Sequence, residues 1–201
     1  MIEDVFASRT QTRIFSNFDY PEESLVRSMI EKTFSIVPSK QNLIPYMIHV
    51  LGPSHDEYKK KLYKIVSNSG GGGNYGNKNI FAPYVLLFTC RLCFPNRFVF
   101  KKMHKDNHIF NVCNKEKYSK NNSDVFLEMG MFSTILTGMC LEKDISVGYL
   151  KCFSEDMNDW KDIDFVDDPV VFSMQLGYKN QKHKFTEGED RPYIDEVINW
   201  V

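Results

Sequence analysis

The chain has 201 residues, 42% of them hydrophobic, and a formal net charge of -1. This length suits one domain over residues 1–201, or one subunit that completes its core with a partner. The near-zero net charge argues against a nucleic-acid-binding protein or a basic membrane-surface protein. No continuous apolar run approaches the length of a membrane span, and the first residues lack the basic start of a secretory signal, so we expect a cytoplasmic protein.

Two arginines near the N-terminus, Arg9 and Arg13, stand four residues apart. They place a double positive charge where a dianionic phosphate can bind, although most such pairs are simply a solvated surface. Residues 21–35 then carry apolar side chains at helical spacing and acids in the first turn, which predicts an amphipathic helix. This helix leads into the turn Pro38-Ser39-Lys40-Gln41-Asn42, whose short polar groups suit a flat heterocycle.

An apolar run over residues 44–51 predicts a buried strand, and residues 84–90 predict a second one. Between them, Ser54 and Glu57 have the spacing of a capping box at the start of a further helix. Residues 69–77 form a glycine-rich loop. Its spacing does not match a phosphate-binding P-loop, so it is either a mobile linker or a loop at the mouth of a binding site.

Basic and aromatic side chains alternate over residues 91–122. Such a segment could stack single-stranded nucleic acid, but the net charge of the whole chain opposes this reading. The five cysteines form no disulfide framework, and the spacing among Cys90, Cys93, Cys113, His104 and His108 is too irregular for a zinc site. We therefore expect no metal.

Residues 123–141 are apolar nearly all round, which predicts a helix buried on every side. Small residues at Gly130, Thr134 and Gly138 allow another helix to approach closely, either within one subunit or across a dimer interface. Residues 169–176 alternate as a strand does. The tail over residues 191–201 is apolar enough to need a surface to cover.

Taken in chain order, these segments resemble the FMN-dependent nitroreductases over nearly the whole chain. The resemblance rests on the arginine pair, the Pro38-Ser39-x-x-Asn42 turn, Ala82-Pro83, the apolar helix, Val147-Gly148, Gly177-Tyr178 and Arg191-Pro192. The sequence departs from the family pattern at Gln11, at Lys40-Gln41, at Tyr46 and in the turn after the apolar helix.

The resemblance implies an α+β fold with a mixed, mostly antiparallel sheet flanked by helices, in an intertwined homodimer. It implies FMN sites shared between the subunits, with the Pro38–Asn42 turn supplied by the opposite subunit and residues 91–122 covering the pocket. Backbone near Val147 and Gly148 would face the flavin N5, and the positive charge of Arg13 would stabilise reduced flavin. The full implied set of cofactor-binding residues is Arg9, Thr10, Gln11, Arg13, Pro38, Ser39, Lys40, Asn42, Asn74, Val147, Gly148 and Arg191.

The implied function is that of an oxidoreductase that passes a hydride from NADH or NADPH through the flavin to an electron-poor acceptor such as a nitroaromatic or a quinone. Because the cofactor carries the chemistry, no protein nucleophile is required. Two alternatives stay open. One is a non-catalytic flavin-binding or interaction protein, and the other is a related flavin chemistry such as dehalogenation, heterocycle oxidation or flavin fragmentation.

Overall fold

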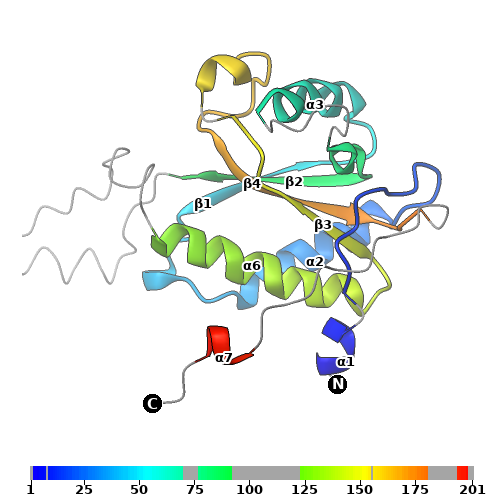
Figure 1. Cartoon of the computed structure of the whole chain (residues 1–201), viewed down its shortest axis with the longest axis vertical. Helices are drawn as coiled ribbons and strands as arrows, with labels where there is room; N and C mark the ends of the chain where they lie inside the picture. The colour runs from blue at the N-terminus through cyan, green and yellow to red at the C-terminus, as the bar shows by residue number, and fades with distance from the viewer. Residues whose placement is uncertain are drawn as a thin grey trace, which may run out of the picture.

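The computed structural model describes residues 2–7, 9–69, 77–91, 123–154, 156–180 and 194–198 (Figure 1). Four strands form one sheet, and helices cover both of its faces. In chain order the elements are α1 (Ile2–Ala7), α2 (Glu23–Ile36), η1 (Lys40–Asn42), β1 (Tyr46–Leu51), α3 (Asp56–Ser69), η2 (Lys78–Phe81), β2 (Tyr84–Cys90), α6 (Ser123–Leu141), β3 (Ser146–Leu150), η3 (Met157–Trp160), β4 (Val170–Gly177) and α7 (Ile194–Val197).

The strands lie in the order β1-β2-β4-β3, and each of the three pairings is antiparallel. The expected α+β class with a mostly antiparallel sheet is confirmed, and no parallel pair occurs among the described strands. An isolated bridge between Phe15 and Lys179 ties the chain before α2 to the chain that follows β4. The sheet is therefore joined to the N-terminal segment at the end of β4.

The central strand β2 is buried from Tyr84 to Thr89, which explains why its sequence is a continuous apolar run. Leu86 and Phe88 point into a core formed with α2 and α6, whereas Val85 and Leu87 point into a second core. In Figure 1 these two cores lie on opposite faces of the sheet, α2 and α6 on one side and α3 with η3 on the other. Each fully buried aliphatic side chain contributes about 1.5 to 3 kcal/mol to this packing.

Two element boundaries differ from the sequence-based expectation. Strand β1 begins at Tyr46 rather than at residue 44, because Ile44 has a positive φ of 47° and cannot join a strand. Helix α3 begins at Asp56, so Ser54 lies outside the cap position and the predicted capping box is wrong. No helix in the described part of the chain is long and apolar enough to cross a membrane.

The prediction that α6 is buried on every side is also wrong for the single chain. Phe126 and Leu127 are 46% and 63% exposed, although Phe132 and Leu136 on the opposite side are fully buried in the core. Gly138 is covered by the ring of Phe6, which lies 3.4 Å from the position that a β-carbon would take. One apolar face of α6 is thus left uncovered by the described residues.

Candidate functional site

Residues 9–15, which we call the N-terminal arm, run beside the edge strand β3. The backbone N–H of Thr12 donates to the carbonyl oxygen of Val147 at 3.0 Å, and Gln11 Nε2 donates to the carbonyl oxygen of Tyr149 at 2.8 Å. Gly148, between these two, has no side chain, and the carbonyl of Thr12 takes the space of its missing β-carbon. Gly148 therefore faces the arm rather than an open surface, and the carbonyl of Val147 is bound to the same arm.

The side chains of the arm divide into two sets. Thr12 is 1% exposed, whereas Arg9 and Arg13 are exposed. Gln11, which lies between the two arginines in the sequence, is the arm residue whose side chain reaches β3. Burial raises the pKa of the Tyr149 hydroxyl, while its hydrogen bonds and the nearby positive charge of Arg9 act in the opposite direction. The arm therefore carries two exposed cations beside a strand edge.

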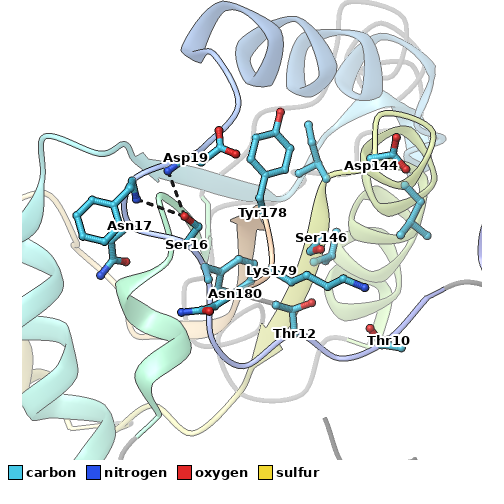
Figure 2. Close-up of a pocket in the computed structure, with 15 residues that line it drawn as sticks. Thr10, Thr12, Ser16, Asn17, Asp19, Asp144, Ser146, Tyr178, Lys179 and Asn180 are labelled. Carbon is cyan, nitrogen blue, oxygen red and sulfur yellow. Dashed lines mark hydrogen bonds between the residues drawn. The ribbon is translucent and has the colours of Figure 1, made fainter. Parts of the chain in front are cut away.

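A hollow of about 860 Å³ lies between the arm, the turn after α6 and the end of β4 (Figure 2). Thr10 and Val147 line it, but Arg9, Gln11 and Arg13 do not. In Figure 2 the side chain of Lys179 extends between Ser146 and Thr12. The hollow is lined by Thr10, Thr12, Phe15, Ser16, Asn17, Phe18, Asp19, Leu141, Asp144, Ile145, Ser146, Val147, Tyr178, Lys179 and Asn180. The hollow and the arginine pair are therefore separate features of the arm.

Residues 38–45, which we call the polar turn, lead from α2 into β1. Pro38 and the side chains of Lys40 and Asn42 are exposed, and Ser39 is half-buried. Ser39 Oγ accepts a hydrogen bond from the backbone N–H of Ile44 at 2.9 Å, which closes the turn. The polar turn therefore presents its predicted binding residues at the surface on a defined backbone.

Two charged residues that the sequence did not single out contact the polar turn. Glu128 of α6 is 4% exposed, and its Oε1 accepts from the backbone N–H of Lys40 at 2.8 Å. Arg91, directly after β2, donates from Nε to the carbonyl of Ile44 at 3.0 Å and from Nη2 to the carbonyl of Leu43 at 2.6 Å. The one sequence signal for Glu128 is that it is an acid within an otherwise largely apolar helix. Arg91 could not be distinguished in the sequence from the other basic residues of the segment 91–122.

Close to Glu128, two buried polar atoms have no hydrogen-bond partner in the described structure, Glu128 Oε2 and the hydroxyl of Tyr46. Burial raises the pKa of Tyr46, and the negative charge of Glu128 raises it further. The Tyr46 hydroxyl is therefore protonated at physiological pH. Tyr46 stands where the sequence departs from the nitroreductase pattern, and its ring packs against Phe88 and Phe132 in the core.

The N-terminal arm and the polar turn lie near different ends of α6 in the same chain. The polar turn is held at Glu128, whereas Phe6, just before the arm, packs on Gly138. Ten helical residues separate these contacts, which corresponds to about 15 Å along the helix axis. The structure thus brings the arm to β3, with Gln11 bound to Tyr149 and Thr12 against Val147 and Gly148, but it does not bring the arm to the polar turn.

An apolar groove of about 520 Å³ runs along the uncovered face of α6 and reaches the polar turn at Pro38. Its wall is formed by Pro38, Phe126, Leu127, Gly130, Met131, Thr134 and Ile135. Gly130 and Thr134, two of the three predicted small residues, are exposed within it. Ile194 and Val197 of α7 are also exposed, at 62% and 69%. Several apolar surfaces therefore stand uncovered in the isolated chain.

Some predicted residues lie outside the described part of the chain. Asn74, Arg191 and most of the excursion, residues 92–122, are among them, as are Cys93, Cys113, His104 and His108. Among the described residues, no group of three or more His, Cys, Asp or Glu side chains is placed to hold a metal ion.

No protein-family model matches the chain, and no curated protein matches its sequence. Solved structures do match its fold. A nitroreductase-like protein from Streptococcus mutans has a TM-score of 0.72 at 14% identity, covering 100% of each chain. A variant of the FMN- and NADPH-dependent nitroreductase NfnB from a Sphingopyxis strain has a TM-score of 0.68 at 14% identity, covering 100% of this chain and 98% of that one.

A third match is a protein from Exiguobacterium sibiricum that was solved in complex with FMN. Its TM-score is 0.70 at 11% identity, and the match covers 100% of this chain and 97% of that one. These identities are low, but the alignments span essentially whole chains and the scores are well above those of unrelated folds. The chain therefore has the α+β fold of the nitroreductase-family proteins.

Proposed function

We propose that the protein is an FMN-dependent oxidoreductase that uses NADH or NADPH to reduce an electron-poor small molecule. The observation that carries this proposal is the arginine pair, Arg9 and Arg13, exposed on an arm that is pinned to β3 in a nitroreductase fold. Similar structures named as FMN-dependent enzymes or solved with FMN give the choice of cofactor.

The residues present fit an FMN molecule in their donor chemistry. Arg9 and Arg13 offer guanidinium donors to a dianionic phosphate without any fixed anionic partner within the arm itself. On the polar turn, Ser39, Lys40 and Asn42 offer a hydroxyl, an ammonium and an amide, the group types that the polar edge and ribityl chain of a flavin require. The positive donors of the arm thus match the phosphate end of FMN, and the polar donors of the polar turn match its ribityl chain and flavin edge.

The positions of these two donor sets support a site that is shared between two subunits. In one chain they lie near different ends of α6, and an apolar groove extends from Pro38 along the same helix. A second copy packed into that groove would cover Phe126 and Leu127 and would bring the polar turn of one subunit toward the arm of the other. The exposed apolar side chains of α7 would gain a surface in the same assembly.

Each residue then has a defined task. Bound FMN would supply the redox chemistry, taking a hydride from a nicotinamide donor and giving it to the acceptor. Arg9, Thr10 and Arg191 would bind phosphate, and Arg13 would place positive charge beside the ring atoms that gain electron density. Val147 and Gly148, which contact the arm through Thr12, would act by holding Gln11 and the arginines in position.

The test begins with the purified chain. It should bind FMN with the yellow colour of a flavoprotein, and heat should release FMN rather than FAD, as identified by chromatography. Anaerobic NADH or NADPH should then bleach the bound flavin. Failure to bind FMN after reconstitution would refute the proposal, whereas binding without bleaching would support the non-catalytic alternative. A panel of nitroaromatics, quinones and halogenated aromatics would then separate nitroreductase-like activity from related flavin chemistry.

A further inference from the structure

The polar turn contains two residues with left-handed backbone conformation that are not glycine. Asn42 has a φ of 55° and Ile44 a φ of 47°. Asparagine tolerates this region, but it is strained for a β-branched residue such as isoleucine. Such a conformation persists only where the surroundings hold it in place, and strained residues of this kind cluster at functional sites.

In addition to the hydrogen bond from the Ile44 N–H to Ser39 Oγ, Arg91 helps to hold this conformation. Its backbone N–H donates to the carbonyl of Pro45 at 3.0 Å, and its guanidinium donates to the carbonyls of Ile44 and Leu43. Three successive carbonyl groups of the turn are thus bound to one residue. A planar guanidinium with donors in a fixed fork suits this arrangement, and lysine could not reproduce it.

Glu128 holds the other end of the turn. Its Oε1 accepts from the N–H of Lys40, while its Oε2 is buried without a partner in the described structure. Burying a carboxylate with one oxygen unpaired opposes folding, and an apolar side chain at this position of α6 would avoid that cost. The presence of Glu128 is therefore better explained by what it does to the polar turn than by stability.

We propose that Arg91 and Glu128 are positioning residues that together hold the polar turn, through Ile44 and Lys40, in the strained conformation that binds the flavin. This inference rests on the proposed function. Neither residue is assigned a contact with the cofactor. Both act through the backbone, Arg91 from the end of β2 and Glu128 from α6, so the flavin-binding geometry is tied to the core on both sides.

The sharpest test is a double-mutant cycle at Arg91 and Ile44. Arg91→Met should raise the FMN dissociation constant by about tenfold or more, because a charge-assisted anchor is lost. Glycine adopts the left-handed region without strain, so in an Ile44→Gly background the same Arg91→Met change should cost markedly less. Fluorescence titration gives the FMN dissociation constant of the wild type, the two single variants and the double variant. An equal penalty in both backgrounds would overturn the role assigned to Arg91.

Glu128 is tested with a conservative pair. Glu128→Gln keeps an acceptor for the Lys40 N–H and should bind FMN within about threefold of the wild type, whereas Glu128→Met removes the acceptor and should bind about tenfold more weakly. Equal losses in the two variants would contradict a role through this hydrogen bond. Arg27→Met, which removes an exposed arginine paired with Glu23 on α2, is the control and should change nothing.

A second readout uses the protein without any flavin. Hydrogen exchange of the peptide over residues 38–46 should accelerate in Arg91→Met and in Glu128→Met while exchange in β2 and β4 stays unchanged. Unchanged exchange of that peptide would overturn the proposal even if FMN binding fell. If no variant and no wild-type protein binds FMN, the proposed function fails, and the exchange data still decide whether Arg91 and Glu128 hold the turn.

Discussion

The carbonyl oxygen of Thr12 lies against the α-carbon of Gly148, in the space that the β-carbon of any other residue would occupy. The N–H of the same Thr12 donates to Val147, the residue before Gly148. The N-terminal arm therefore touches β3 with its backbone, which no side chain at residue 148 would permit. This close approach sets the position of Gln11 and of the arginine pair beside it.

Replacing Gly148 with alanine should push the arm away from β3. The new β-carbon would clash with backbone rather than with a flexible side chain, so we expect a loss of about 1 to 3 kcal/mol in the free energy of unfolding. Urea denaturation measures this. Gly52→Ala is the matched control, since its β-carbon would meet only His55 and Tyr84 at 3.8 Å. Similar stabilities for the two variants would show that the arm is not held at Gly148.

Arg9 and Arg13 should differ in what they do to the flavin. A phosphate contact acts almost equally on oxidised and reduced cofactor, whereas a cation beside the ring favours the reduced state and the transition state that leads to it. Arg9→Ala should therefore weaken FMN retention and leave the reduction potential nearly unchanged. Arg13→Gln should lower the potential and cost about 2 to 4 kcal/mol of transition-state stabilisation.

Spectroelectrochemical titration of both variants at equal FMN occupancy separates these roles. Equal potentials would show that Arg13 is only a second phosphate ligand. The charge beside the ring would then have to come from Lys40 or Lys78, which are both exposed.

Thr134→Trp should prevent assembly of the proposed dimer. Thr134 is exposed in the apolar groove of α6, so an indole there has room in the isolated chain but would overpack against a second copy by about 1 to 3 kcal/mol at each contact. Light scattering should report a shift toward monomer together with weaker FMN binding. Lys161→Trp, on the other face of the sheet, should leave the dimer intact. A wild-type monomer that binds FMN tightly would refute the shared site.

Lys59 should make stability depend on alkaline pH. This side chain is 2% exposed, its Nζ donates to the carbonyl of Pro83 at 2.9 Å, and burial lowers its pKa to about 8 against the opposing effect of Asp56. Between pH 8 and the ordinary lysine value of 10.5, the unfolded chain binds more protons than the folded chain, so stability rises with pH. The full gain in the free energy of unfolding is on the order of 3 kcal/mol.

The comparison that isolates this effect is Lys59→Met, which should lack the rise between pH 8 and 10.5. Urea denaturation at several pH values measures it, with exposed Lys32→Met as the control. If stability depends on pH in the same way in wild type and in Lys59→Met, then folding does not lower the pKa of Lys59.

The elements that the sequence predicts best are those whose pattern is local. The limits of α6 and β2 follow from predominantly apolar runs, and both agree with the structure. The start of β1 does not, because the backbone of Ile44 is set by Arg91, a residue 47 positions away in the chain. The spacing of Arg9 and Arg13 is likewise local, so the arginine pair could be recognised from the sequence.

The contact between Glu128 and Lys40 spans 88 residues, and no local pattern encodes it. For the same reason, the exposed face of α6 could not be told from its buried face. A helix that is apolar all round gives no periodic signal, and only the packed sheet shows which side remains free.

The separation of the arm and the polar turn along α6 has a genetic consequence. In the proposed dimer, a chain damaged at Arg9 and a chain damaged at Glu128 carry their defects in different halves of the shared site. A mixed dimer of the two would hold one site with both defects and one site with neither. Two inactive variants, unfolded together and refolded as a mixture, should therefore recover FMN binding that neither shows alone, which is interallelic complementation.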